Sequence, residues 1–240
     1  MKVALCLSGH LRTYEKTYES IYEQLYSKYD VDTFISTWKN LGNRKFAVDD
    51  PNAPKDEIVD IEVIKKIYNP IYIAMHDAET DVVSNKLKKE YETAKLGNGD
   101  RMSQLMVMLY KIQEANGWKK LHEDKNNFKY DVVIRSRFDV YLKYINMELV
   151  KEKLYCTPGC NGITDFVFAG PSLTMDELCD IFTVLSPDIP FGSFGNIDQL
   201  WKTHLENNNI PFEASWDGFD YLRYAVAGKF DSKGNKLGDY

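Results

Sequence analysis

The stretch that decides the fold is "KVALCLSGHLRTYEKTYESIYEQLYSKYDVDTFISTW", residues 2–38. Residues 2–9 form a nearly continuous apolar run, which is typical of a strand buried on both faces of a sheet. Apolar and tyrosine side chains then recur every three or four residues over 13–29, the spacing of an amphipathic helix. A second apolar run, 31–38, completes a strand–helix–strand unit, which favours a parallel sheet with a right-handed crossover.

The rest of the chain continues this alternation of strands and helices. Apolar runs predict further strands at residues 71–77, 130–140 and 165–170. Helical spacing predicts helices at residues 60–68, at 101–125, from Ser172 or Thr174 onward, and at 196–210. The sequence therefore predicts an α/β protein of Rossmann-like type, with a mostly parallel sheet flanked by helices.

Three segments are expected to depart from this regular pattern. Asn116 and Gly117 are expected to interrupt the long helix or to end its first part. Residues 79–100 are polar and charged, and we expect a mobile or helical excursion there. The Gly-, Lys- and Asp-rich end of the chain, 229–240, is expected to form a loosely ordered tail. We therefore expect one domain over residues 1–228.

Composition and charge argue against several classes of protein. The chain has 240 residues, of which 44% are hydrophobic and 28% charged, as in an ordinary globular protein. Its net charge of -6 provides no overall positive field, so we expect no nucleic-acid partner. The apolar run at the N-terminus is too short for a signal peptide, and no stretch approaches the roughly 20 apolar residues of a membrane span. We therefore expect a cytoplasmic protein without a transmembrane segment.

The four cysteines are few and scattered for a disulfide framework. Cys156 and Cys160 form a possible metal clip, with Cys179 as a third ligand. Their spacing departs from the two-residue knuckle of zinc sites, however, and no histidine lies nearby in the sequence. We expect reduced, structural thiols.

Polar side chains follow three of the predicted strands at the point where each strand ends. The carboxyl ends of parallel strands meet at one edge of a sheet, and ligands of open α/β sheets bind there. These side chains are therefore expected to line one site. They are Ser8, Gly9, His10 and Arg12 after the first strand, Ser36, Thr37 and Trp38 after the second, and Arg135, Arg137 and Asp139 after the fourth.

These residue types suit a ligand that carries phosphate. Gly9 permits close approach of the backbone, Arg12 can fork onto phosphate oxygens, and Asp139 can hold a divalent cation that neutralises a diphosphate. The chain contains neither the GK[ST] ending of a phosphate-binding loop nor a GxGxxG dinucleotide fingerprint. The alternative is that Arg135 or Arg137 pairs with an acid such as Asp139 in a structural salt bridge. Both interpretations stay open.

Several motifs of the chain resemble, in the same order, bacterial and viral glycosyltransferases of the GT-A fold. They are "VALCLSGHLRTYEKTYESI" with "DVDTFISTW", "MSQLMVMLYKIQEAN", "YDVVIRSRFDVYL" and "DFVFAGPSLTMDEL". The resemblance covers roughly residues 2–210. It is nearest to sugar transferases from polysaccharide gene clusters and large DNA viruses. If the chain is viral, the resemblance implies that it is located in the host cytoplasm. It implies a nucleotide-sugar-binding half, about 1–140, and an acceptor-side half, 141–228. It also implies transfer of a hexosyl or pentosyl group from a UDP- or GDP-sugar to a glycan or glycoprotein, as in polysaccharide biosynthesis.

The resemblance also assigns a metal position. In GT-A enzymes a DxD motif follows the fourth strand and binds Mn²⁺ or Mg²⁺ through the donor diphosphate. The matching place reads Arg137-Phe138-Asp139, so an arginine replaces the first carboxylate. Either Asp139 ligates the metal alone, or Arg135 and Arg137 take over part of the charge neutralisation. We expect Asp139→Ala to abolish turnover while barely changing the melting temperature.

Further candidates complete the predicted site. If the reaction inverts the anomeric centre, an acceptor hydroxyl must lose its proton, and Asp165 and Asp198 are the candidate bases. A carboxylate at the position of Asp198 equally fits the start of a helix. Trp201 and Trp216 are candidates for the acceptor side. The residues expected to contact the nucleotide are Ser8, Gly9, His10, Arg12, Trp38, Arg101, Gln104, Arg135 and Arg137.

Two alternatives to this function stay open. The missing first carboxylate of the DxD motif is compatible with a catalytically degenerate module that binds a nucleotide or a glycan. A different nucleotide-dependent transferase on a Rossmann-like sheet is the other alternative.

Overall fold

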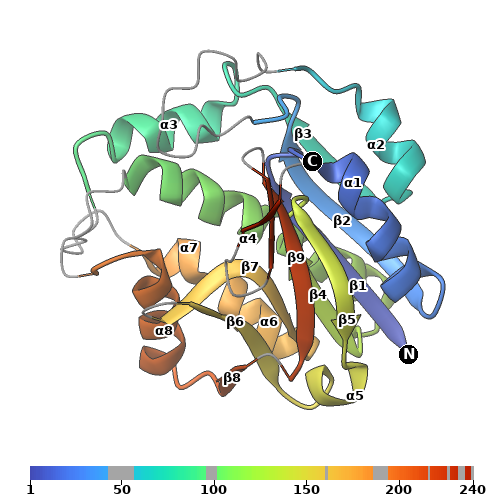
Figure 1. Cartoon of the computed structure of the whole chain (residues 1–240). Coiled ribbons are helices and arrows are strands. Elements are labelled where there is room, and N and C mark those ends of the chain that lie inside the picture. The colour runs from blue at the N-terminus through green and yellow to red at the C-terminus, as the bar shows by residue number, and fades with distance from the viewer. Residues whose placement is uncertain are drawn as a thin grey trace.

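The computed structural model describes residues 1–42, 57–95, 102–159, 162–185, 194–215, 217–225, 228–231 and 236–238. These residues form a seven-stranded sheet, a four-stranded sheet and the helices that flank them (Figure 1). The predicted α/β class, with a mostly parallel sheet between helices, is confirmed.

The seven-stranded sheet has the strand order β3-β2-β1-β4-β7-β6-β8. Its strands are β1 (Lys2–Gly9), β2 (Asp30–Trp38), β3 (Tyr72–His76), β4 (Val132–Ser136), β6 (Leu154–Gly159), β7 (Gly162–Gly170) and β8 (Phe212–Ala214). β1 pairs in parallel with β2 and β4, and β2 pairs in parallel with β3. β7 runs antiparallel to both β4 and β6. The first strand–helix–strand unit therefore forms as predicted.

Helices cover both faces of this sheet (Figure 1). α4, α6 and α8 pack on one face, with α3 and α7 against α4, whereas α1, η1 and α2 lie on the other face. The helices are α1 (Tyr14–Ile21), the π-helical η1 (Tyr22–Tyr26), α2 (Ile61–Tyr68), α3 (Val82–Glu90), α4 (Met102–Asn126), α5 (Met147–Val150), α6 (Ser172–Cys179), α7 (Ile181–Val184) and α8 (Ile197–Asn207). Because successive side chains of a strand point to opposite faces, Ala4 and Cys6 of β1 pack under α4 while Leu5 and Leu7 pack under α1.

A second, antiparallel sheet has the strand order β11-β10-β9-β5. Its strands are β5 (Val140–Ile145), β9 (Phe219–Ala225), β10 (Gly228–Asp231) and β11 (Lys236–Gly238). Val140, Leu142 and Phe219 of this sheet are buried in the same apolar cluster as α1. The second sheet thus closes the α1 side of the molecule.

One strand prediction is wrong at this point. The stretch 130–140 was expected to be one strand, but β4 ends at Ser136, a turn follows, and β5 belongs to the second sheet. A local apolar pattern does not reveal such a change of sheet. Within the expected loose tail, residues 229–231 and 236–238 lie in strands, because their backbone pairs with β9 and β10.

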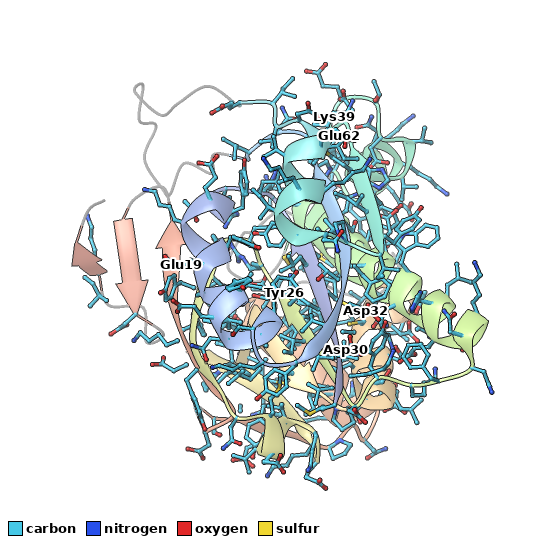
Figure 2. All side chains as sticks on the ribbon, turned by 90° about the vertical axis from the view of Figure 1, so that its right-hand side faces the viewer. Glu19, Tyr26, Asp30, Asp32, Lys39 and Glu62 are labelled. Carbon is cyan, nitrogen blue, oxygen red and sulfur yellow. The ribbon has the colours of Figure 1, made fainter. Side chains whose placement is uncertain are left out.

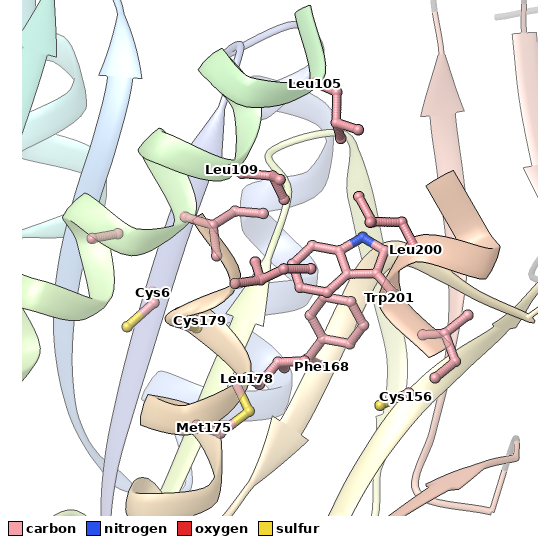
Figure 3. Packing of buried hydrophobic residues seen from close by; sticks show 14 of the residues in the cluster. Cys6, Leu105, Leu109, Cys156, Phe168, Met175, Leu178, Cys179, Leu200 and Trp201 are labelled. Atoms are coloured by element: carbon pink, nitrogen blue, oxygen red, sulfur yellow. The ribbon is translucent and has the colours of Figure 1, made fainter. Parts of the chain in front are cut away.

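The larger apolar cluster is built around Trp201 of α8, which is completely buried (Figure 3). The Trp201 ring lies 4.9 Å from that of Phe168 on β7, measured between centroids. Leu105 and Leu109 of α4 and Leu200 of α8 belong to the same cluster. Trp201 is therefore a core residue, which corrects its expected place on the acceptor side.

Three of the cysteines lie in the interior. Cys6, Cys156 and Cys179 are buried, free thiols, as Figure 3 shows, and the expectation of structural thiols is confirmed for them. Burial raises the pKa of Cys6 to about 12, so this thiol stays protonated at neutral pH. Cys160 lies outside the described residues.

Charged side chains lie on the outside of α1, β2 and α2 (Figure 2). Glu19, Asp30 and Glu62 are exposed there, whereas the hydroxyl of Tyr26 lies 2.6 Å from Oγ1 of Thr33. None of the described helices has the length and apolar character needed to cross a membrane.

The predicted break at Asn116-Gly117 is wrong, because α4 continues through both residues. Asn116 is buried, and its side-chain amide donates a hydrogen bond of 2.9 Å to Oδ1 of Asp176 on α6. This tertiary contact outweighs the poor helix propensities of Asn and Gly. Gly117 itself is exposed, and a Cβ atom there would find no other atom within 4 Å.

Gly117→Ala should therefore stabilise the protein by about 1 kcal/mol, because alanine loses less backbone entropy in a helix. We expect a rise in melting temperature of roughly 2–4 °C in a thermal melt followed by circular dichroism. Gly162→Ala is the matched control, since its Cβ would overlap the backbone carbonyl of Asp198, and its melting temperature should fall. A lower melting temperature for Gly117→Ala would contradict the continuous helix.

Candidate functional site

The carboxyl ends of the four parallel strands meet at one edge of the central sheet, opposite the end marked N in Figure 1. Ser8 of β1 pairs in register with Ser36 of β2, and Trp38 of β2 pairs with His76 of β3. The predicted meeting of the polar strand ends is confirmed by this register.

A cluster of three arginines and two aspartates lies at the ends of β1 and β4, and we call it the guanidinium cluster. Its members are Arg12, Arg135, Arg137, Asp139 and Asp165. Asp139 is at its centre, since Nε and Nη2 of Arg137 donate to its two carboxylate oxygens at 2.9 Å each. Nη1 of Arg12 donates to Oδ2 of the same carboxylate at 2.6 Å. Both oxygens of Asp139 therefore accept hydrogen bonds from guanidinium groups.

The antiparallel direction of β7 brings Asp165 to this cluster. Asp165 lies near the start of β7, which is next to the end of β4 because the two strands run in opposite directions. Nη1 of Arg137 lies 3.4 Å from each carboxylate oxygen of Asp165. Nη1 of Arg135 donates to the backbone carbonyl of Asp165, and its Nε donates to Oγ of Ser8 at 3.1 Å.

The members of the cluster differ in how far they reach the surface. The side chains of Asp139 and Arg135 are each 1% exposed. Those of Arg12, Arg137 and Asp165 are 10%, 14% and 9% exposed. A ligand that approaches the cluster therefore meets the latter three groups, and the carboxylate of Asp139 lies beneath them.

Arg135 and Arg137 keep their positive charge at neutral pH. Burial by itself lowers the pKa of Arg137, but the charges of Asp139 and Asp165 outweigh burial and raise this pKa above its ordinary value. Burial lowers the pKa of Arg135 to about 10, with Asp165 opposing the change. The guanidinium of Arg137 also lies over the ring of Phe166, 4.9 Å from its centroid.

The turn after β1 has a backbone that favours glycine at one position. Gly9 has φ +105°, a conformation that residues with a side chain rarely adopt. Its carbonyl accepts a hydrogen bond of 2.7 Å from Oγ1 of Thr37, and the N–H of Arg12 donates to the carbonyl of Leu41 at 2.7 Å. These bonds hold the turn that carries Arg12.

Trp38 and His10 form a stacked pair beside this turn. Their ring centroids are 4.5 Å apart and Trp38 is only 5% exposed. Trp38 also belongs to the main apolar cluster. Trp38 is therefore packed as a core residue in the described structure, with His10 over its ring.

The described residues do not fit the expected Mn²⁺ or Mg²⁺ site. A cation at Asp139 would have to displace guanidinium groups from the carboxylate. If the guanidinium groups stayed nearby, the cation would be repelled by them, and two like unit charges 4 Å apart cost about 4 kcal/mol at an effective dielectric constant of 20. Among the residues that the structure describes, no three His, Cys, Asp or Glu side chains gather in a group that could hold a metal ion. The carboxylate that was expected to bind a cation is occupied by arginines instead.

A second polar cluster at the same sheet edge was not predicted, and we call it the Glu114 cluster. Its members are Ser36, His76, Asp81, Tyr110, Lys111 and Glu114. The Glu114 carboxylate lies 2.9 Å from Nε2 of His76 and 3.0 Å from the hydroxyl of Tyr110, and it accepts from Ser36. Lys111 is completely buried, with Nζ 3.4 Å from Glu114 and 3.6 Å from Asp81.

One signal in the sequence could have found this cluster. Lys111 stands four residues after Val107 and four before Ala115, both buried, so it places a charge in the apolar stripe of α4. A buried lysine needs anionic partners nearby. The signal does not identify Asp81 or His76, because those residues come from a different part of the chain.

The Glu114 cluster makes stability depend on pH. Burial by itself raises the pKa of Glu114, but hydrogen bonds from His76 and Ser36 and the charge of Lys111 lower it from 4.5 to about 2. The depressed pKa contributes up to roughly 3 kcal/mol of stability, which is present above about pH 5 and is lost as the pH falls towards 2.

Glu114→Gln should destabilise the protein at neutral pH, and its deficit relative to the wild type should shrink as the pH falls from about 5 to about 3. The reason is that wild-type Glu114 must take up a proton in this range when the chain unfolds, whereas Gln cannot. Urea unfolding at several pH values measures the two free energies of unfolding. Glu62→Gln, an exposed residue, is the control, and a deficit for Glu114→Gln that does not change with pH would contradict the assignment.

The remaining predicted residues lie in different places. Asp198 is in the first turn of α8 and packs against the hairpin of β6 and β7, where its carboxylate fills the space beside Gly159. The N-cap of α8 is Asn196, whose side chain accepts from the N–H of Gln199 at 3.0 Å. Gln104 is exposed on the first turn of α4. Arg101 and Trp216 lie outside the described residues.

Comparison with known proteins adds little to this geometry. No family model matches the chain, and no curated protein matches it. Among solved structures, it is similar to mouse xyloside xylosyltransferase 1 in its apo form, with 9% sequence identity and a TM-score of 0.47 over 90% of this chain and 85% of that chain. At this identity and TM-score the likeness carries no argument about activity or site.

Proposed function

We propose that this chain is a glycosyltransferase that moves a hexosyl or pentosyl group from a UDP- or GDP-sugar to a glycan or glycoprotein acceptor. The guanidinium cluster is the proposed site of the donor diphosphate. The observation that carries the proposal is the pair of partly exposed arginines, Arg12 and Arg137, fixed at the carboxyl ends of parallel strands beside the Gly9 turn. The order of the motifs described for the sequence supports the same function, with a donor half over 1–140 and an acceptor half over 141–228.

The chemistry of glycosyl transfer explains why arginines would be placed there. As the bond between the sugar carbon and the diphosphate oxygen breaks, the leaving diphosphate gains negative charge. Guanidinium groups that are already positioned stabilise this charge without reorganisation. Arg12 and Arg137 can each present a fork of N–H donors to phosphate oxygens, which a lysine cannot do.

Asp165 is the proposed base for the acceptor. Its side chain is buried but reaches the surface further than that of Asp139, with 9% exposed against 1%, and it lies beside Arg137. The new bond joins the acceptor oxygen to the sugar carbon, and the hydroxyl proton passes to the Asp165 carboxylate if the configuration is inverted. Asp198 is the second candidate base, and it lies beside Gly162 at the start of β7. Gly162 is three residues before Asp165, which is roughly 10 Å along the strand.

The test is release of the free nucleotide, UDP, GDP or CMP, from a panel of UDP-, GDP- and CMP-sugars, with and without simple sugar acceptors. We expect one donor to be consumed, and Asp165→Asn to lower kcat at least about 100-fold, because a positioned base contributes this much. Asp217→Asn, at an exposed position, should behave like the wild type. If the protein consumed none of the nucleotide sugars in the panel, the proposed glycosyltransferase activity would be contradicted.

A non-catalytic module is the second candidate function. The observation in its favour is that Asp139, the position of the last DxD carboxylate, is buried between two arginines. Binding of a nucleoside diphosphate without turnover of any of its sugars would identify such a module.

A further inference from the structure

We propose that this site neutralises the donor diphosphate without a divalent cation, and that Asp139 is a positioning residue that holds Arg12 and Arg137 ready for it. The inference rests on the proposed function and deepens it. It reverses the role that the DxD resemblance gives to Asp139.

Asp139 lies between two chain segments. Arg137 and Asp139 belong to the turn that follows β4. Within this turn, Nε and Nη2 of Arg137 donate hydrogen bonds to the carboxylate of Asp139. Arg12 comes from the turn after β1, where it has φ +46°. Oγ1 of Thr17 on α1 donates to the carbonyl of Phe138 at 2.6 Å, which anchors the turn from the other side. The carboxylate thus joins the β1 and β4 turns.

The two arginines reach further towards the surface than Asp139 does. The side chain of Asp139 is 1% exposed, whereas those of Arg12 and Arg137 are 10% and 14% exposed. A diphosphate that enters this edge of the sheet meets guanidinium N–H groups before it meets the carboxylate. A cation bridging Asp139 to a phosphate would have to take the place of these guanidinium groups.

Arg12 and Arg137 supply positive charge to the site. Two guanidinium groups carry the same total charge as one Mn²⁺ or Mg²⁺ ion, and they are held at fixed positions by hydrogen bonds to Asp139. Their charge does not depend on pH near neutrality. They are therefore able to perform the neutralisation that a metal performs at a DxD motif.

Calorimetric titration of UDP, GDP, ADP, CDP and dTDP into the wild-type chain tests the inference. Each nucleotide is titrated once with EDTA and once with Mn²⁺. We expect one of them to bind, with dissociation constants in the two buffers that agree within about twofold. Mn²⁺ electron paramagnetic resonance is the second readout, and the protein should remove no more free Mn²⁺ than the nucleotide alone.

Variants at Arg137 test the positioning. Arg137→Gln should weaken binding at least about tenfold in both buffers, because one charge-assisted fork is lost. Arg137→Lys should recover only part of this loss, since an ammonium group keeps the charge but cannot grip both Asp139 oxygens. Lys202→Gln removes a positive charge from an exposed position of α8 and should leave binding unchanged.

The outcomes separate the inference from the function on which it rests. Binding that requires Mn²⁺, or a protein-dependent loss of free Mn²⁺ that Asp139→Asn abolishes, would overturn the cation-free site and leave the transferase standing. Full recovery of binding by Arg137→Lys would overturn the positioning role of Asp139. Binding of none of the five nucleotides in either buffer would overturn both proposals.

Discussion

Asp139→Asn should lower the free energy of unfolding by about 3–5 kcal/mol, the usual effect of removing one partner from a buried ion pair. The substitution leaves the guanidinium groups of Arg12 and Arg137 facing a neutral amide, whose NH₂ group cannot accept a hydrogen bond. This expectation replaces the small change in melting temperature that the sequence predicted for Asp139→Ala. That prediction took a carboxylate at a strand end to contribute little to packing, whereas Asp139 is buried and bonded to two arginines.

Urea unfolding at neutral pH measures the effect, with Asp217→Asn as an exposed control of the same chemistry. A double-mutant cycle with Arg12→Gln separates the pair from other effects. Either single replacement already removes the interaction between Arg12 and Asp139. The double variant should therefore lose less stability than the sum of the losses of the two single variants. Strictly additive losses, or a loss below about 1 kcal/mol for Asp139→Asn, would show that the two charges are not coupled.

Lys119→Met is expected to have an effect of similar size at a different place. Lys119 of α4 is completely buried, and its Nζ lies 3.1 Å from Glu123, 2.6 Å from Oγ of Ser172 and 2.7 Å from Asp176 on α6. Without the lysine, Glu123 and Asp176 would remain buried with less of their charge compensated. The loss should be about 3–5 kcal/mol.

The pH dependence of this loss distinguishes the charge from the packing. Burial by itself raises the pKa of Glu123, but hydrogen bonds from Ser172 and Lys129 and the charge of Lys119 lower it below its ordinary value. The stability that this lowered pKa contributes is lost as Glu123 takes up a proton, so the deficit of Lys119→Met in urea unfolding should shrink as the pH falls below about 4. Lys120→Met is the control, because Lys120 is 40% exposed and lies 3.7 Å from Asp180. A deficit for Lys119→Met that equals that of the control, or that does not change with pH, would contradict a buried charge network.

Local patterns in the sequence were sufficient for the elements whose signals are local. The apolar runs of β1 and β2 and the helical spacing of α1 are local signals, and each was sufficient to predict its strand or helix. The short connections between these elements favour the parallel pairing of β1 with β2. The same holds for β3 and α8, which occur where they were predicted. The meeting of Ser8 and Ser36 at one sheet edge follows from this topology alone.

The features that the sequence did not reveal depend on distant partners. α4 runs through Asn116 because Asp176, 60 residues away, accepts its amide. Asp165 meets Arg135, 30 residues earlier, because β7 runs antiparallel to β4, which its sequence does not reveal. The Glu114 cluster was missed for the same reason, since Ser36 and Glu114 are 78 residues apart.

We expect the donor diphosphate to bind Arg12 and Arg137 while Asp139 holds both arginines in place. A crystal structure with the tightest-binding nucleoside diphosphate, grown in the presence of Mn²⁺ and measured for its anomalous signal, tests this claim most directly. We expect diphosphate oxygens within hydrogen-bond distance of both arginines, with the carboxylate of Asp139 still between them and no anomalous peak beside it. An Mn²⁺ ion on Asp139 with Arg137 turned away, or a nucleotide bound far from β1 and β4, would contradict it.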